Sequence, residues 1–315
     1  MNKTLTKWES LQWLRERFLS PSTSSHTNDY WEERPELLAL YDHSFAARIG
    51  WKWDSVLAEI KAKNWAPPES YVLVDWGCGT GRASRSFLES FGDRPPEEIY
   101  LHDHSARALA FATEKLKPLG IPLHSALPAS TGSQKMVLLV SHVLSELPSR
   151  SRERLFHWTQ FADAVIWIEP GTPDSSQKLI QLREQSREKF VVVAPCPHQA
   201  VCPLKENPKD WCHFFADIPS MVHQSAEWRE FSEALNIDLR SLPVSYLCLQ
   251  KGITAEQKKG GRLIGRPRVY KGYLTGLICR ESTAVEEKFL KRDKTGPFRE
   301  LKEGGFRLAI PDNKP

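Results

Sequence analysis

The chain has 315 residues, of which 40% are hydrophobic and 26% are charged, and it carries a formal net charge of +4. This composition is ordinary for a soluble globular protein, and the length suits one large domain with extensions or two modest ones. No run of 18 apolar residues occurs, which excludes a membrane-spanning helix.

The charge is unevenly distributed along the chain. Residues 251–315 contain 16 Lys and Arg and 8 Asp and Glu, a net charge of +8, so the first 250 residues sum to −4. A basic tail on a mildly acidic body suggests a polyanionic partner, and nucleic acid is the usual one; the alternative is a solubilising surface. The N-terminus has no apolar signal core, so the six cysteines are expected to be reduced thiols or metal ligands rather than disulfides.

In chain order, residues 1–66 are predicted to be helical, with an amphipathic first helix that carries Trp8, Leu11, Leu14 and Phe18 on one side. From residue 67, short apolar runs alternate with helical patterns. The predicted strands are 71–74, 98–103, 136–140, 164–168 and 190–194, and the predicted helices are 82–91, 106–118, 152–161 and 175–189. This alternation predicts an α/β fold with a doubly wound, Rossmann-like parallel sheet.

The alternation ends at residue 195. Residues 195–220 contain five prolines and three cysteines and favour neither a helix nor a strand. A helix is predicted at 226–235, and the apolar runs 244–249 and 273–278 are predicted to pair as the final strands, with a Gly- and Lys-rich link at 258–261 between them. We therefore predict an N-terminal helical region at 1–66, a core domain at 67–250 with a Cys-rich insert at 195–220, and a basic extension at 251–315 that contributes the final strands.

A glycine loop, Asp75-Trp76-Gly77-Cys78-Gly79-Thr80-Gly81, lies between a predicted strand and a predicted helix. Its glycines permit a tight turn and a close approach to a ligand, and Asp103 ends the next strand, where an acid grips ribose hydroxyls. A dinucleotide site and a plain structural turn are the alternatives. Because an acid stands two residues before the first glycine, the loop resembles motif I of class I S-adenosylmethionine-dependent methyltransferases. The resemblance implies that the methionine end of the cofactor is held by Asp75, Gly77, Gly79 and Gly81, and the ribose by Asp103.

The second motif is a cysteine block with the spacing C-x5-C-x9-C, formed by Cys196, Cys202 and Cys212. Thiolates are soft ligands that suit zinc or iron–sulfur clusters, and unligated thiols are the alternative. The composition leaves both zinc bound by three Cys and one His and a cluster bound by four Cys open. Cys248 is expected to be a core thiol, and Cys78 is given no metal role.

No catalytic residue is assigned. The segment after the third predicted strand reads Ser141-His142-Val143-Leu144-Ser145-Glu146-Leu147-Pro148 and lacks the Asn-Pro-Pro-Tyr motif of adenine amino-group methylation. Pro195-Cys196 matches the nucleophile motif of RNA cytosine-5 methyltransferases only superficially, because it follows a different strand. His142 and Glu146 are candidate acid/base groups, but their place at the start of a helix favours an ordinary surface.

Four features, in order, resemble the methyltransferase-like small-ribosomal-subunit assembly proteins of mitochondria and bacteria. They are the glycine loop, the segment Ser141–Leu147, the Cys-Pro-His…Cys-Pro…Trp-Cys-His-Phe block at 196–214, and Arg266-Pro267-Arg268…Lys271-Gly272 leading to Cys279. The resemblance covers about residues 30–300, and the cysteine block is its most specific part.

The resemblance implies a 4Fe-4S cluster on Cys196, Cys202, Cys212 and Cys279, with zinc as the alternative metal. It also implies a bound S-adenosylmethionine and binding to small-subunit rRNA, without assigning methyl transfer. The cations expected on RNA are Lys258, Lys259, Arg262, Arg266, Arg268 and Lys271. An active rRNA methyltransferase and a zinc-stabilised small-molecule methyltransferase are the alternatives. The expected location is the cytoplasm in a bacterium and the mitochondrion in a eukaryote.

Overall fold

The computed structural model describes residues 6–19, 30–128, 134–147, 149–254, 260–293, 297–302 and 309–310. Lys258 and Lys259, which we predicted to contact RNA, lie outside these residues. Within the described ranges, none of the helices combines the length and the apolar character needed to cross a bilayer.

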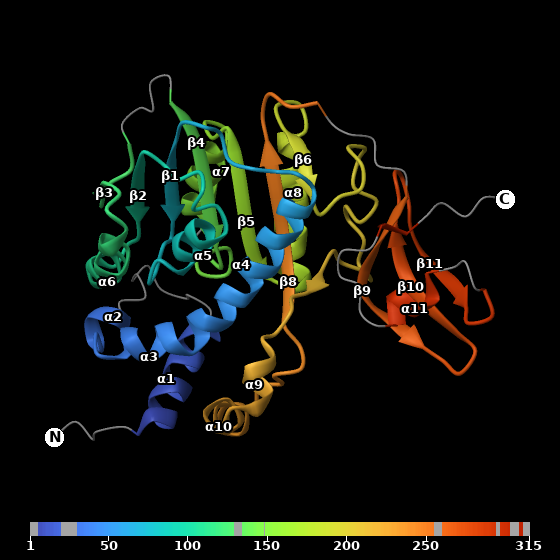
Figure 1. Ribbon diagram of the computed structural model, residues 1–315, viewed down its shortest axis with the longest axis horizontal. Coiled ribbons are helices and arrows are strands. Elements are labelled where there is room, and N and C mark those ends of the chain that lie inside the picture. The colour runs from blue at the N-terminus through green and yellow to red at the C-terminus, as the bar shows by residue number, and fades with distance from the viewer. Residues whose placement is uncertain are drawn as a thin grey trace. The chain divides into compact units, whose positions relative to one another are not determined.

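The chain divides into two compact units, whose helices and strands are labelled in Figure 1. The first contains Met1–Ala58, Ala66–Ala162 and Asp217–Leu242, and the second contains Glu59–Trp65, Asp163–Ala216 and Pro243–Pro315. The domain boundaries predicted from the sequence follow the chain linearly and stay a prediction.

The first unit contains a sheet of parallel strands in the order β3-β2-β1-β4. Its strands are β1 (Tyr71–Trp76), β2 (Glu98–His102), β3 (Leu123–His124) and β4 (Lys135–Ser141). The helices are α1 (Lys7–Leu19), α2 (Tyr30–Glu33), α3 (Leu37–His43), α4 (Phe45–Ala62), α5 (Arg82–Ser90), α6 (Ala106–Leu116), α7 (Ser149–Thr159), α9 (Ser220–Gln224) and α10 (Ala226–Leu235), with a 3-10 turn at Lys117–Leu119. The last turn of α4 belongs to the second unit.

Strand β1 is buried along its whole length, as the apolar run 71–74 predicts, and its burial includes Asp75. It pairs with β2 on one side and β4 on the other, so that Asp75 lies between Leu101 and Leu139. The strand order therefore reverses direction between β1 and β4, which is where doubly wound sheets bind ligands.

The predicted N-terminal helix is present as α1, and Leu11 and Leu14 are completely buried. It packs against α3 and α10, which come from distant parts of the sequence. Aromatic rings join these helices, including Phe18 against Tyr41 and Phe45 against Phe231.

In the second unit, β8 (Pro243–Gln250) lies between β5 (Ala164–Pro170) and β6 (Val191–Ala194) and runs antiparallel to both. Helix α8 (Pro173–Ser186) connects β5 to the segment before β6, and β7 (Phe214–Phe215) also pairs with β8. The sheet is thus mixed rather than wholly parallel, because β8, which was expected to pair outside the parallel sheet, runs antiparallel between β5 and β6. Segment 244–249 carries the continuous apolar run typical of a central strand, and this run does not encode direction.

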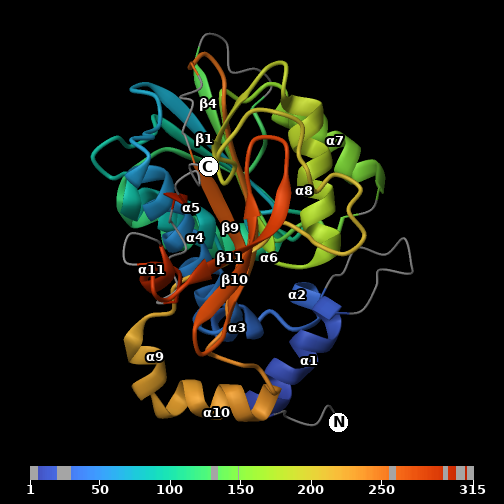
Figure 2. The ribbon, with the colours of Figure 1, turned by 90° about the vertical axis from the view of Figure 1, so that its right-hand side faces the viewer.

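A second sheet follows, in the order β11-β10-β9-β12 (Figure 2). Its strands are β9 (Gly261–Val269), β10 (Tyr273–Cys279), β11 (Ala284–Leu290) and β12 (Ala309–Ile310), and α11 (Phe298–Lys302) contributes to its core. Segment 273–278 is therefore not the partner of 244–249, so that predicted pairing was wrong. The sequence did not predict β9. The Arg, Gly and Pro residues of this strand interrupt its apolar residues, so that no apolar run longer than a few positions remains.

Arg262 is 6% exposed and therefore cannot contact RNA as predicted. Its guanidinium donates to Glu59 Oε2 (2.8 Å), to the Tyr246 hydroxyl (2.9 Å) and to the Pro195 carbonyl (3.2 Å). Burial by itself raises the pKa of Glu59, but the nearby cations Arg262 and Lys63 lower it to about 2. Glu59 is thus an ionised carboxylate in a buried ion pair.

We predict that Arg262→Ala lowers the free energy of unfolding by about 3–5 kcal/mol, because it leaves the buried carboxylate of Glu59 without its main partner. Arg268→Ala is the matched control on the same strand. Arg268 pairs with Glu286 at 2.9 Å, but both side chains are largely exposed (68% and 47%), so its loss is expected to cost less than about 1 kcal/mol. Chemical denaturation measures both variants, and equal effects would contradict a stabilising role for the buried pair.

Candidate functional site

The glycine loop connects β1 to α5 at the carboxyl end of β1. Gly77, Gly79 and Gly81 all have positive φ angles (72°, 50° and 74°), which explains why glycine is needed here. The amides of Gly77 and Cys78 donate to the His102 carbonyl (2.7 and 3.1 Å), and this attaches the loop to the end of β2. A Cβ at Gly77 would lie 2.4 Å from Val143, whereas a Cβ at Gly79 would meet no atom within 4 Å. Gly79 therefore faces open space, as a ligand-binding loop requires.

Asp103 lies beside this loop. Its Oδ2 accepts a hydrogen bond from the amide of Gly79 (2.9 Å), and its Oδ1 accepts one from the amide of Ser105 (3.0 Å), the N-cap residue of α6. A carboxylate has further lone pairs beyond these two bonds, so it remains able to accept ribose hydroxyls. The structure thus brings together Asp103 and the three glycines, as the motif predicted.

Asp75 is fully buried on β1. Its Oδ2 accepts two hydrogen bonds from Ser84 on α5, from the hydroxyl (2.6 Å) and the amide (3.2 Å). Oδ1 has no hydrogen-bond partner among the described residues. Burial raises the pKa of Asp75 to about 6, with Asp103 adding to the rise and the bonds from Ser84 opposing it. A buried carboxylate with an unused acceptor fits a cationic ligand group such as the ammonium of a methionine moiety.

A pair that the sequence did not predict lies in the same unit. Lys52, buried on α4, has its Nζ 3.0 Å from Nε2 of His142, which follows β4 in a left-handed conformation. Burial and the charge of Lys52 hold the pKa of His142 well below its usual value, so the imidazole is neutral at pH 7. His142 is therefore half-buried and in contact with Lys52 rather than simply a surface residue. No sequence pattern links positions 52 and 142, because only tertiary packing makes them neighbours.

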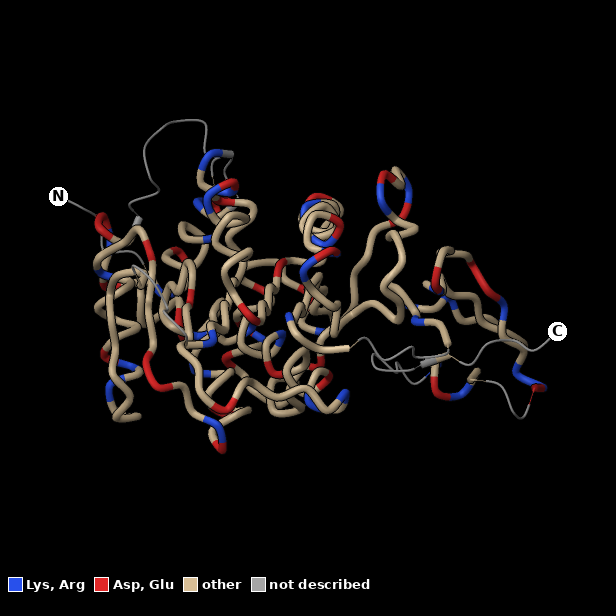
Figure 3. The backbone as a smooth tube through the Cα atoms, turned by 90° about the horizontal axis from the view of Figure 1, so that it is seen from above, with Lys and Arg blue, Asp and Glu red and all other residues tan. Residues whose placement is uncertain are grey.

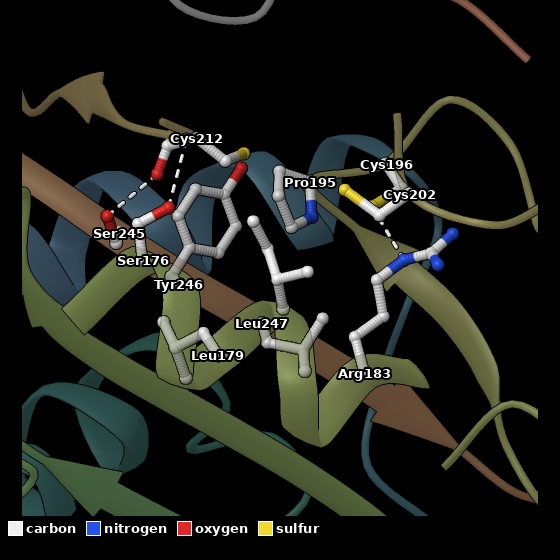
Figure 4. A pocket seen from close by; sticks show the side chains of 11 residues that line it. Ser176, Leu179, Arg183, Pro195, Cys196, Cys202, Cys212, Ser245, Tyr246 and Leu247 are labelled. Carbon is white, nitrogen blue, oxygen red and sulfur yellow. Dashed lines mark hydrogen bonds between the residues drawn. The ribbon is translucent and has the colours of Figure 1, made fainter. Parts of the chain in front are cut away.

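The second unit gathers the cysteines. Cys196, Cys202 and Cys212 line a cavity of about 30 Å³ together with Arg183, Leu179 and Tyr246 (Figure 4). Cys279, at the end of β10, packs in one buried cluster with Cys202 and Cys212, and its Sγ lies 3.5 Å from Nε2 of His198. The structure thus brings all four predicted ligands to one region.

The thiols of this region influence each other electrostatically. The pKa of Cys212 is raised well above its usual value by burial, and then by Cys196, Cys279 and Cys202. The pKa of Cys279 is raised by burial and by Cys196 and Cys202. A cation among these thiols would remove the repulsion and favour the thiolates, so the donor set fits a metal or a cluster. In the part of the chain that is described, however, no three Cys, His, Asp or Glu side chains are placed to hold a single ion.

Arg183 on α8 holds the cysteine block, and the sequence did not indicate this. Its Nε donates to the Sγ of Cys196 (3.2 Å), and its Nη2 donates to the carbonyls of His198 (3.3 Å) and Ala200 (2.8 Å). A single arginine within a helical pattern carries no signal of such a role, because its partners lie 13 to 17 residues away in an irregular loop.

Residues 53–304 match the family model described as "Mitochondrial small ribosomal subunit Rsm22". The chain belongs to this family. The match covers well over half of the chain and includes the glycine loop, the three cysteines of the block and Cys279, so the family resemblance drawn from the sequence is confirmed.

A human relative in the curated collection of proteins carries the name "Ribosome assembly protein METTL17, mitochondrial". The two sequences are 29% identical over an alignment of 206 residues. The alignment covers 58% of this chain and 45% of the relative. The chain thus spans less than half the length of that protein. Among solved structures, it is similar to the mitomycin 7-O-methyltransferase MmcR (12% identity, TM-score 0.42, 78% of this chain and 68% of that one) and to an rRNA methylase from Streptococcus thermophilus (11% identity, TM-score 0.37, 62% and 96%).

The raised pKa of Asp75 predicts a pH effect on stability. Because the folded-state pKa (about 6) exceeds the ordinary value of 3.8, the stability that protonated Asp75 contributes is fully present below pH 3.8 and is lost as the pH rises through 6. Asp75→Asn keeps a neutral side chain at every pH. Between pH 4 and 7.5 we expect the free energy of unfolding of the ligand-free wild type to fall relative to this variant by about 2–3 kcal/mol. A difference that stays constant with pH, measured by chemical denaturation, would contradict the assignment.

Proposed function

We propose that this chain is an assembly factor of the small ribosomal subunit that binds rRNA, holds S-adenosylmethionine on the glycine loop and carries a 4Fe-4S cluster in the cysteine block. The observation that carries the proposal is the family match over residues 53–304, which includes both sites in one chain. The named human relative is a mitochondrial ribosome assembly protein, and a mitochondrial location follows for this chain if it is eukaryotic.

Three features of the loop support the cofactor proposal. Gly79 faces open space, Asp75 has an unused buried acceptor, and Asp103 stands at the end of β2. In this proposal the carboxylate of Asp75 would accept a hydrogen bond from the ammonium group of the methionine moiety, and the carboxylate of Asp103 would accept hydrogen bonds from the ribose hydroxyls. When bound, S-adenosylmethionine supplies an activated methyl group, but the assembly role does not depend on its transfer.

The chemistry of the donor set supports the cluster proposal. In a 4Fe-4S cluster each thiolate binds a different iron, so its cysteines need not converge on one point as the ligands of a single zinc do. Cys196, Cys202, Cys212 and Cys279 come from three separated segments and meet in one buried region, which suits a group that joins them. Arg183 donates a hydrogen bond to the Sγ of Cys196 and so orients this side chain within the cysteine block.

A second candidate function is an active rRNA methyltransferase. The neutral, half-buried His142 beside Lys52 favours it, because a general base near the end of β4 would be needed to remove a proton from some methyl acceptors. Val143, the next residue, packs against Gly77, which places this pair next to the glycine loop.

We expect the purified chain to co-sediment with small-subunit particles, and to do so much less well as salt rises. If about four phosphates are neutralised, raising the salt from about 50 to about 200 mM should lower the affinity roughly 100-fold. Large-subunit particles are the control. Failure to co-sediment at low salt would remove the assembly proposal. Methyl transfer from labelled S-adenosylmethionine to the same particles, lost in Asp103→Ala, would instead favour the active enzyme.

We further expect protein purified without oxygen to be brown and to contain about four irons per chain. Cys279→Ala should lose the colour and most of the iron, because it removes one of the four thiolates. Cys248→Ala is the matched control, since Cys248 is an equally buried thiol within β8 that lies outside the cysteine cluster. A colourless protein with one zinc would favour the zinc-stabilised alternative, and unchanged iron in Cys279→Ala would rule out this residue as a ligand.

A further inference from the structure

The hairpin that joins β9 to β10 carries two tyrosines at its turn. The amide of Tyr270 donates to the Tyr273 carbonyl (2.8 Å), so Lys271 and Gly272 form a tight two-residue turn. The two rings are stacked, with centroids 4.6 Å apart and planes 19° from parallel. Tyr270 is 45% exposed, and its neighbour Val269 is 48% exposed. The hairpin therefore presents an aromatic surface to solvent rather than to a core.

Cations surround this aromatic pair. The register pairs Thr275 with Arg268 on one side and with Lys288 on the other, so both cations lie on the face of Thr275. Lys288 Nζ lies 4.1 Å from the centre of the Tyr273 ring. Tyr273 therefore contacts both the ring of Tyr270 and the ammonium group of Lys288. Tyr273 is only partly exposed, whereas Tyr270 is 45% exposed, so the Tyr270 ring is accessible beyond its contact with Tyr273.

Both signs of charge occur in this sheet (Figure 3), but around the tyrosines the balance is positive. Arg268, Lys271 and Lys288 are exposed, and Glu286 is the acidic residue that pairs with Arg268. That ion pair is exposed on both sides, so a phosphate would compete with Glu286 at little cost. We call Arg268, Tyr270, Lys271, Tyr273 and Lys288 the tyrosine hairpin.

An exposed aromatic face among cations suits unpaired nucleotides. Every base has a flat face that stacks on an aromatic ring, and Lys and Arg neutralise the phosphates on either side. In a duplex the bases are already stacked on one another, so a tyrosine side chain would add little. A protein partner with acidic side chains would use the cations but would have no specific need for the free ring face.

We propose that the tyrosine hairpin binds single-stranded RNA, with one base stacked on the outer face of Tyr270 and the adjoining phosphates on Lys271 and Lys288. This inference rests on the proposed rRNA-binding function and assigns a site to it. Arg262, four positions from Arg266 on the same strand, takes no part because it is buried in its ion pair with Glu59.

The test is the binding of a fluorescently labelled single-stranded oligouridine to the full chain, followed by anisotropy. Tyr270→Ala should weaken binding roughly 10-fold, whereas Tyr270→Phe, which keeps the ring, should bind within about 2-fold of the wild type. Phe161→Ala is the matched control, because Phe161 is another exposed ring (57%) in the other unit. Lys288→Glu should weaken binding more strongly at low salt, and Lys117→Glu, an exposed lysine elsewhere, should not.

Several results would overturn the proposal. Unchanged binding in Tyr270→Ala would remove the stacking contact, and an equal loss in Tyr270→Phe would assign it to the hydroxyl instead. Duplex RNA that depends on Tyr270 as much as single-stranded RNA does, or tighter Tyr270-dependent binding of oligoglutamate, would point to a different partner. Co-sedimentation with small-subunit particles distinguishes a failure of the assembly function from a failure of the RNA site on the tyrosine hairpin. A wild type that co-sediments while Tyr270→Ala binds RNA normally leaves the assembly role intact and removes only this site, whereas a wild type that binds neither removes both.

Discussion

The buried guanidinium of Arg262 is the interaction on which the second unit depends. A charge that is almost wholly removed from water is tolerated only if it is paired and hydrogen-bonded. Here the partners come from separate segments, namely Glu59 at the end of α4, Tyr246 on β8, the carbonyl of Pro195 and the ring of Phe214, 4.3 Å away. Pro195 and Phe214 stand at the two ends of the cysteine block. One ionic centre therefore fixes where the block leaves the sheet and where it returns.

Between those ends the cysteine block has almost no regular structure, and side-chain hydrogen bonds replace it. Arg183 holds the loop after Cys196, and the Gln199 side chain pairs with both the amide and the carbonyl of Val192 (2.9 Å each). The amide of Cys212 donates to Ser176 (2.9 Å). These bonds satisfy backbone groups in and beside the irregular segment and hold its thiols in a partly buried region. A cluster bound there would meet cysteines that are already close, which lowers the ordering cost of binding.

The first unit buries a carboxyl group that has no cationic partner among the described residues. The carboxyl group of Asp75 lies on β1 inside the sheet, where Ser84 is its one hydrogen-bond partner among the described residues, and the ionised form is correspondingly unfavourable. Such a group is costly to folding but favourable toward a cationic ligand, since the charge of the ligand would compensate for the burial. The acidic loop of the first unit and the cationic tyrosine hairpin of the second thus suit chemically opposite ligands, a cationic small molecule and a polyanion.

The sequence by itself determined the elements whose signals are local. The apolar run 71–74 followed by glycines predicted β1, the turn and α5, because positive φ angles at Gly77, Gly79 and Gly81 demand glycine whatever the surroundings. The cysteine spacing likewise indicated Cys196, Cys202 and Cys212, whereas Cys279 was expected only from the family resemblance. Tertiary structure alone decided the antiparallel course of β8, the burial of Arg262, the contact of Lys52 with His142 and the accessible ring of Tyr270. Each of these depends on partners far apart in sequence, and an apolar run, an arginine or a tyrosine reads the same locally whether packing buries it, pairs it or leaves it in water.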